Sequence, residues 1–296
     1  MPQKSKYASK PALTIHCHYH KTVYSKLPRS SFDCFHGFTV FSNRFVEKDS
    51  RICYDVGPRT LRTIIEPDRN TISSYVATPP DIEKDLLLDL IFFQPLKFIL
   101  QEKKLYILHA SCAVRNGQGV IFSGKSGSGK SSLALALLRH GFSYLADDKL
   151  VIRSEVGRIQ CCVFSSRPKI SKRSLALFPE FKDFVINGGA RNEKILIDVD
   201  RISPPQKTAE PAMLIFPKFT RSALTRLEPL DKQSALARLA REESSHLKNV
   251  GRKYFEAHFM MLSDFIRHVK CYKLFYSDRD FKKVPELIIP LLQKKS

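Results

Sequence analysis

The sequence lacks the features that mark secreted and membrane-spanning proteins. Its seven cysteines include no Cys-x-x-Cys pair and no regular spacing, a pattern typical of reduced thiols. Residues 1–15 are polar and basic without an apolar core, so no secretory signal is expected. The most apolar stretch, residues 86–93, is broken by Asp89 and is too short to cross a bilayer. These absences predict a cytoplasmic protein with no membrane span.

Acidic residues are also scarce. The chain has 49 Lys and Arg against 29 Asp and Glu, a net charge of +20, and such a surface attracts polyanions. The basic residues occur in scattered adjacent pairs, such as Lys103 with Lys104 and Lys282 with Lys283, and no long basic block is present. This spread disfavours a nucleic-acid partner. The remaining candidate partners are a nucleotide, an acidic peptide or small protein, and a membrane surface.

The 296 residues suffice for one large or two modest domains. In the first hundred residues, short runs of β-forming residues are separated by Pro, Gly, Asn and Asp, which predicts a small antiparallel sheet over residues 13–19, 38–45, 51–56 and 61–65. Apolar residues at three- and four-residue steps then predict a helix over 81–101, kinked or interrupted at Pro95. We therefore expect a β-rich N-terminal segment over 1–103 and a second domain over 104–296.

A glycine-rich stretch organises the second domain. Residues 124–132 read Gly-Lys-Ser-Gly-Ser-Gly-Lys-Ser-Ser and fit the pattern Gly, four residues, Gly-Lys-Ser. An apolar run precedes the stretch and a helical pattern follows it. Its glycines let consecutive amides face phosphate oxygens at the start of the following helix. The predicted nucleotide-binding residues are Gly124, Lys125, Ser126, Gly127, Ser128, Gly129, Lys130, Ser131 and Ser132.

Within this stretch, two side chains have specific expected roles. Lys130 is placed to reach the β- and γ-phosphates, and the Ser131 hydroxyl to ligate Mg²⁺. The sequence therefore predicts ATP and Mg²⁺ as cofactors.

Further polar residues flank the motif. His109 lies in the apolar run Leu105–Val114, which is expected to be one strand, and Asp147 and Asp148 follow the predicted helix. The dipeptide Asn116-Gly117 predicts a tight hairpin between that strand and the next. Both His109 and the aspartate pair are expected to converge on the γ-phosphate.

This combination resembles the HPr kinase/phosphorylase family. The matching elements are His109, the loop 124–131, Arg139-His140-Gly141 and Ala146-Asp147-Asp148, in the family's order and spacing. The resemblance implies an α/β fold with a P-loop kinase core of the HPr kinase C-terminal-domain type, following the β-rich N-terminal segment.

The resemblance also implies a reaction, the transfer of the γ-phosphoryl group of ATP to a serine hydroxyl. Lys130, His109 and Asp147 would be the catalytic residues. Asp147 would be the base that orients the acceptor hydroxyl, and Asp148 would lie on the metal side with Ser131. Adjacent residues at a strand end point in opposite directions, so the sequence leaves the order of the two aspartates open. The family's hexamers imply a homo-oligomer.

The chain also departs from the family. Its first hundred residues differ from the family's N-terminal domain, and the family's glycine-rich signature after the aspartates is missing, so neither the dephosphorylating activity nor HPr as acceptor is implied. The chain is more similar to divergent kinases of this type that phosphorylate a serine of a small precursor peptide, including lasso-peptide kinases. A small-molecule kinase of the same fold and a non-catalytic nucleotide switch are the alternatives.

Two later segments have more than one interpretation. Residues 165–174 are basic and contain proline, as a loop facing the acceptor or a phosphate would, or as a solvated loop. Residues 187–194 contain Gly188 and Gly189, and form either a hinge that brings Arg191 or Lys194 over the γ-phosphate or an ordinary surface turn.

Overall fold

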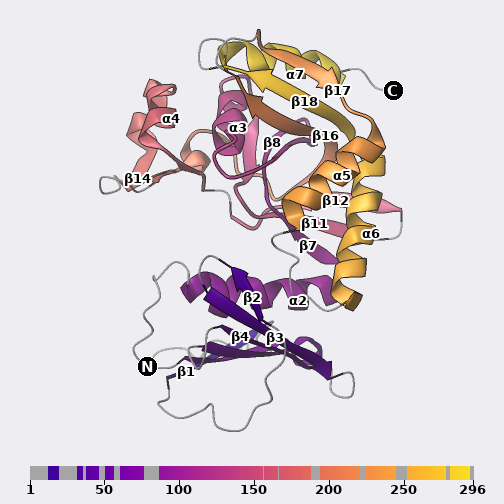
Figure 1. Cartoon of the computed structure of the whole chain (residues 1–296). Coiled ribbons are helices and arrows are strands. Elements are labelled where there is room, and N and C mark those ends of the chain that lie inside the picture. Colours follow the sequence, from indigo (N-terminus) through magenta and orange to yellow (C-terminus); the bar gives the residue numbers. More distant parts are fainter. Residues whose placement is uncertain are drawn as a thin grey trace, which may run out of the picture. The chain divides into compact units, whose positions relative to one another are not determined.

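A computed structural model describes residues 13–19, 32–35, 38–46, 51–56, 61–76, 87–155, 157–165, 167–187, 194–220, 224–244, 252–277 and 281–293. The chain divides into two compact units. One unit comprises Met1–Lys103 with Asn249–Phe255, and the other comprises Lys104–Lys248 with Glu256–Ser296. Figure 1 labels their helices and strands.

The first unit contains a six-stranded sheet in the order β1-β6-β5-β4-β3-β2. The strands are β1 (Thr14–Tyr19), β2 (Phe32–Phe35), β3 (Phe38–Val46), β4 (Arg51–Val56), β5 (Leu61–Glu66) and β6 (Thr71–Val76). All neighbours are antiparallel except β1 and β6, which run parallel. The prediction of a purely antiparallel sheet is therefore wrong. Strand β6, which the sequence pattern did not reveal, lies between β5 and β1 and pairs with both. Parallel strands need a long connection, and here the other strands of the sheet lie between β1 and β6 in the chain.

A helical segment follows the sheet in this unit. It consists of a π-helical turn, η2 (Asp89–Phe93), and the helix α2 (Gln94–Glu102), with Pro95 in the first turn of α2. The predicted interruption at Pro95 is found, because proline lacks the N–H that a continuous helix needs there. Residues 81–86 lie outside the described residues. Phe98 and Ile99 of α2 pack with Ile65, Ile72 and Tyr254 to form the core of this unit.

The second unit is mixed α/β. Its largest sheet has nine strands, in the order β10-β8-β9-β16-β12-β11-β7, with β18 on β16 and β17 on β18. The bounds are β7 (Leu105–Leu108), β8 (Ala110–Arg115), β9 (Gln118–Ser123), β10 (Ser143–Ala146), β11 (Leu150–Glu155), β12 (Arg158–Cys162), β16 (Thr208–Phe219), β17 (Arg226–Pro229) and β18 (Lys270–Tyr276).

The predicted single strand over 105–114 is two strands. Strand β7 pairs with β11, whereas β8 pairs with β9 and β10. Only His109 separates them along the chain, although they occupy distant places in the strand order. The sheet must therefore curl, and His109 lies where the chain passes from one part of the sheet to the other. The apolar sequence on both sides of His109 gave no sign of this break.

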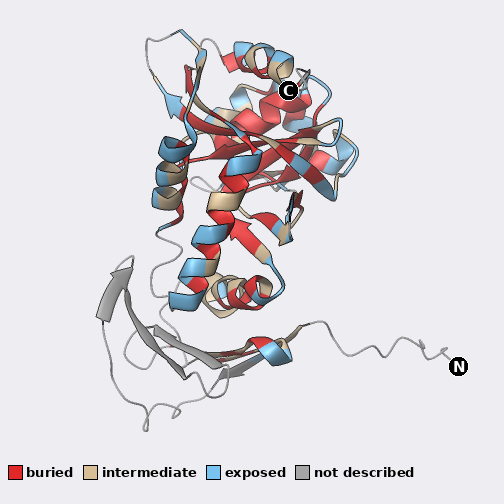
Figure 2. Ribbon diagram, turned by 90° about the vertical axis from the view of Figure 1, so that its right-hand side faces the viewer, coloured by how far each residue is buried: buried red, intermediate tan, exposed pale blue. Residues whose placement is uncertain are grey.

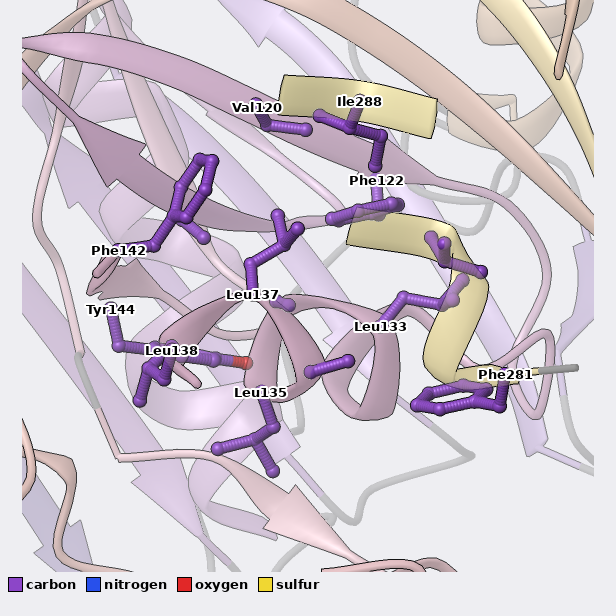
Figure 3. Close-up of a cluster of buried hydrophobic side chains, with 14 of the residues drawn as sticks. Val120, Phe122, Leu133, Leu135, Leu137, Leu138, Phe142, Tyr144, Phe281 and Ile288 are labelled. Carbon is purple, nitrogen blue, oxygen red and sulfur yellow. The ribbon is translucent and has the colours of Figure 1, made fainter. Parts of the chain in front are cut away.

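Helices cover both faces of the sheet. Side chains alternate along a strand, so Val120 and Phe122 of β9 lie in one cluster and Ile121 lies in the other. The helices α3 (Lys130–Leu138) and α7 (Val284–Gln293) pack on the Phe122 face, which Figure 3 shows in close-up. The helices α5 (Lys232–Glu243) and α6 (Arg252–His268) pack on the other face. In Figure 2 the strands between these layers are coloured as buried.

Smaller elements complete the described structure. A three-stranded sheet has the order β13-β15-β14. The elements are β13 (Lys169–Ile170), β14 (Val185–Asn187), β15 (Ile195–Ile197), α4 (Lys172–Ala176), and the 3₁₀ turns η1 (Pro67–Arg69), η3 (Pro179–Phe184), η4 (Val199–Arg201) and η5 (Phe281–Lys283). Asn116 and Gly117 both have positive φ, 52° and 76°, as the hairpin predicted between β8 and β9 requires. None of the described helices is long and apolar enough to cross a membrane.

Leu137 provides a test of this packing. Its side chain is fully buried between α3 and the sheet, so Leu137→Ala should destabilise the fold by about 2–5 kcal/mol through lost burial and a residual cavity. Leu224, with 76% of its surface exposed, is the matched control, and Leu224→Ala should change stability by less than about 0.5 kcal/mol. Denaturant unfolding measures both, and similar costs for the two variants would contradict the described core.

Candidate active site

The glycine-rich loop, residues Gly124–Gly129, connects strand β9 to helix α3. Gly127 and Gly129 have φ of +79° and +86°, in the left-handed region that favours glycine. The Ser128 N–H donates to the Lys125 carbonyl (3.1 Å), which closes a turn inside the loop. Helix α3 begins at Lys130, and its first amides have no partner within the helix. The loop therefore leads into a helix N-terminus of the kind that binds anions.

The Lys130 side chain folds back over this loop. Its Nζ donates to the carbonyls of Gly124 (2.8 Å) and Lys125 (3.3 Å) and contacts His109 Nε2 (3.1 Å). The side chain is buried. Burial lowers the pKa of Lys130, and the carboxylates of Asp148 and Asp147 oppose that effect. The one ammonium group thus connects the loop to the histidine.

His109 lies at the break between β7 and β8 and has partners on both ring nitrogens. An ammonium can only donate, so Nε2 accepts from Lys130, and Nδ1–H then donates to the Asp148 carbonyl oxygen (3.2 Å). This arrangement requires a neutral imidazole. Burial and the charge of Lys130 lower the pKa of His109, which favours the same form.

Asp147 follows β10 and is almost completely buried, with 6% of its surface exposed. Its Oδ1 accepts from the hydroxyls of Ser111 (2.7 Å) and Tyr144 (3.0 Å), and its Oδ2 accepts from the Lys169 N–H (3.0 Å). Burial and the neighbouring charge of Asp148 raise the pKa of Asp147, while Ser131, the Lys169 N–H and the Ser111 hydroxyl oppose the rise.

Asp148 has a different environment from its neighbour. It is half-buried, and its φ is +56°, which is uncommon for a residue with a side chain. The Lys149 N–H donates to the Asp147 carbonyl (2.6 Å), so Asp148 is the central residue of a tight three-residue turn. Backbone strain of this kind costs about 1–3 kcal/mol and clusters at functional sites.

Other predicted residues lie close by in the chain. Lys125 and Ser126 are exposed on the loop, Ser131 is half-buried and Ser132 is buried in α3. The basic segment 165–174 reaches Asp147 through the main chain of Lys169. Of the proposed hinge, residues 188–193 lie outside the described residues, whereas Lys194 is exposed and its charge lowers the pKa of Lys130.

Besides Ser111 and Tyr144, two residues from distant segments support the site and were not identified from the sequence. Glu243 at the end of α5 is buried, and its Oε1 accepts from the main-chain N–H of His109 (2.9 Å). Tyr276 at the end of β18 donates its hydroxyl to the Ser128 carbonyl (2.9 Å). Both residues come from segments more than a hundred positions away from their partners, so no local pattern could have linked them to the site.

Gly129 tests the contact between Tyr276 and the loop. A Cβ at Gly129 would overlap Tyr276 Oη, whereas one at Gly127 would meet nothing within 4 Å. Because φ is positive at both, Gly127→Ala should cost about 1–2 kcal/mol, and Gly129→Ala clearly more. Adding Tyr276→Phe should recover part of the Gly129→Ala loss. Denaturant unfolding gives the three free energies, and equal costs at the two glycines would contradict the contact.

The contact between Lys130 and His109 has a spectroscopic signature. The charge of Lys130 holds down the pKa of His109, so Lys130→Met should raise that pKa towards its ordinary value of about 6.5. NMR titration of the imidazole nitrogens measures it. Lys125→Met, which removes an exposed lysine of the same loop, is the control and should leave the titration nearly unchanged. An unchanged pKa in Lys130→Met would show that the two side chains are not in contact.

Comparison with known proteins finds similarity among solved structures alone. No family model and no curated protein matches the chain. Among solved structures, the chain is similar to the Hpr(Ser) kinase/phosphatase from Coxiella burnetii, with 16% sequence identity. The match covers 63% of this chain and 93% of that chain, with a TM-score of 0.32. At that score, the match stands as a similarity and carries no argument about the reaction.

Proposed function

We propose that this protein is an ATP-dependent kinase that transfers a phosphoryl group to a serine hydroxyl of a peptide or small protein. One observation carries the proposal: a connected set of polar groups surrounds the start of α3. Lys130 joins the glycine-rich loop to His109, His109 joins Lys130 to Asp148, and Ser131 at the start of α3 lowers the pKa of the nearby Asp147 carboxyl. Phosphoryl transfer requires positioning and charge neutralisation, and this set of residues can supply both.

Nucleotide phosphates fit the loop. The left-handed glycines and the open helix start direct main-chain amides to one place. Lys130 lies over the same loop, and its hydrogen bonds to the Gly124 and Lys125 carbonyls can be exchanged for phosphate oxygens. We propose that all nine residues 124–132 form the nucleotide-binding stretch.

Magnesium fits beside Ser131. Mg²⁺ in nucleotide sites is bound through one or two protein oxygens, phosphates and waters rather than by a protein cage. The Ser131 hydroxyl is close enough to the Asp147 carboxylate to lower its pKa, so the two side chains can offer neighbouring oxygen ligands. This also accounts for the finding that the described residues contain no cluster of three or more His, Cys, Asp and Glu suited to a metal. The ion would neutralise charge on the transferring group.

The roles of the two aspartates can be argued from their contacts. The assignment of Asp147 as the base and Asp148 as the metal-side residue stays a prediction from the family resemblance. The contacts of Asp147 favour the reverse order, because both its oxygens already accept hydrogen bonds from Ser111, Tyr144 and Lys169, and Ser131 is close enough to lower its pKa. Asp148 is the more exposed of the two, and His109 holds its main chain.

The net charge bears on the acceptor. With a charge of +20, the protein favours an acidic partner, and Lys125 at the loop and Lys169 beside Asp147 are exposed cations near the reacting groups. We propose an acidic peptide or small protein, and a ribosomally made precursor peptide of the lasso type is one acceptor of this description.

Transfer and nucleotide binding can be separated by mutation. Lys130→Ala should weaken ATP binding and abolish transfer, because the ammonium neutralises the phosphates. Replacing the base aspartate with Asn should abolish transfer and leave ATP affinity unchanged. Replacing the metal-side aspartate with Asn should abolish transfer and also remove the Mg²⁺ dependence of ATP binding. Calorimetry with Mg-ATP, and intact-mass analysis of acidic serine-containing peptides, measure these effects for Asp147→Asn and Asp148→Asn.

Lys207→Ala is the matched control for Lys130→Ala. Lys207 is exposed and precedes β16, at the opposite end of the sheet from the loop, so its loss should change neither measurement. Normal transfer by Lys130→Ala would refute the proposal. ATP binding by the parent protein without transfer to any peptide would instead favour a small-molecule acceptor or a nucleotide switch.

A further inference from the structure

An exposed aromatic side chain lies at the sheet edge that carries the glycine-rich loop. Strands β9, β16 and β18 are parallel neighbours, so their C-terminal ends share one edge, and ligands of α/β sheets bind beyond such edges. Phe219 ends β16 and pairs in register with Tyr276, which ends β18. The Phe219 side chain is 43% exposed, and neither the core nor the proposed transfer step uses it.

Phe219 lies on the face of the sheet that also carries α3. Met213 and Ile215 of the same strand belong to the cluster that packs against α3, and residues two apart on a strand share a face. Phe219 continues this series beyond the buried part. It therefore lies on the side of the sheet from which helix α3 and its N-terminus project.

Tyr276 connects Phe219 to the loop. The two rings meet edge to face, with centroids 5.7 Å apart and an interplanar angle of 76°. The Tyr276 hydroxyl donates to the Ser128 carbonyl (2.9 Å). On the other side of the loop, a Cβ at Gly124 would lie 3.8 Å from Pro217 Cδ, two residues before Phe219. The end of β16 thus lies near the loop at two places, at Gly124 beside Pro217 and, through Tyr276, at Ser128.

The main chain fixes the position of Phe219. The next residue, Thr220, donates its N–H to the Tyr276 carbonyl (2.8 Å), and its hydroxyl contacts the same oxygen (3.3 Å). The pairing of β16 with β18 therefore continues past Phe219. With its main chain fixed and its ring against Tyr276, the exposed Phe219 ring is a surface on which a planar ligand can stack at little entropic cost.

We propose that Phe219 is the platform on which the base of a bound nucleotide stacks, with Tyr276 fixing the platform relative to the loop. The inference rests on the proposed binding of nucleotide phosphates by residues 124–132, and adds the site of the base. In this arrangement the loop holds the phosphates on the β10 side, near Asp147, and the base extends to the β16 and β18 side. Stacking tolerates any base, so this platform supplies affinity for nucleotides over bare polyphosphate.

The chain contains no tryptophan, which allows a single-reporter experiment. Phe219→Trp introduces one indole at the platform, and titration with Mg-ATP should change its emission, whereas tripolyphosphate should not. Phe259→Trp is the matched control. Phe259 is a similarly exposed phenylalanine (40%) on α6, on the face of the sheet opposite α3, and its replacement should respond to neither ligand. Unchanged emission in Phe219→Trp, with ATP binding shown by calorimetry, would overturn the proposal.

A second variant measures the contribution of stacking. Phe219→Ala should weaken ATP binding roughly tenfold and leave the affinity for tripolyphosphate unchanged. An equal loss for both ligands would show that the substitution damages the loop, and no loss for ATP would exclude the platform. ATP binding that depends on Phe219 but is not followed by transfer would support the platform and count against the kinase, so the two proposals can fail separately. Absence of ATP binding in the parent protein would overturn both.

Discussion

The buried ammonium of Lys130 is the constraint on which the arrangement of the site depends. Removing this charge from water is costly unless it is paired and hydrogen-bonded, and here two loop carbonyls, the His109 ring and the charges of two aspartates surround it. For the Gly124 and Lys125 carbonyls to reach Lys130 Nζ, the loop must curl back over the start of α3. The histidine must present an unprotonated nitrogen, which fixes its tautomer and commits its other nitrogen to the main chain of Asp148. One charge therefore sets the conformation of the loop, the state of the ring and the position of the acidic turn.

The curled sheet brings these groups together. His109 is the only residue between β7 and β8, so its position is defined from both sides, by the pairing of β7 with β11 and of β8 with β9. Asp147 follows β10, the neighbour of β8. Glu243 then fixes the His109 main chain from the helix layer on the other face. Each polar group is attached to a strand end or a buried helix, so the site has the rigid support that precise positioning requires.

Local parts of this arrangement were predictable from the sequence, and long-range parts were not. The strand, loop and helix around residues 118–138 and the Asn116-Gly117 hairpin follow from patterns within a few residues. The break at His109 was missed because the apolar run continues across it. The parallel pairing of β1 with β6, and the contacts of Tyr276 and Glu243, join residues far apart in sequence. Such contacts are set by packing between distant segments, which local sequence patterns do not reveal.

The adjacent aspartates show how the fold can make two identical side chains unequal. Asp147 has hydroxyl and main-chain donors on both oxygens, and although burial raises its pKa, those bonds hold the carboxyl in one orientation. Asp148 sits in a strained turn whose left-handed backbone sends the chain away from β10. Such strain persists only where the surroundings over-determine it, and the His109 bond to its carbonyl is part of those surroundings. In the proposed reaction, such different environments would give the two acids different parts: the fixed carboxyl of Asp147 suits a positioning role, and the more exposed Asp148 suits contact with the acceptor.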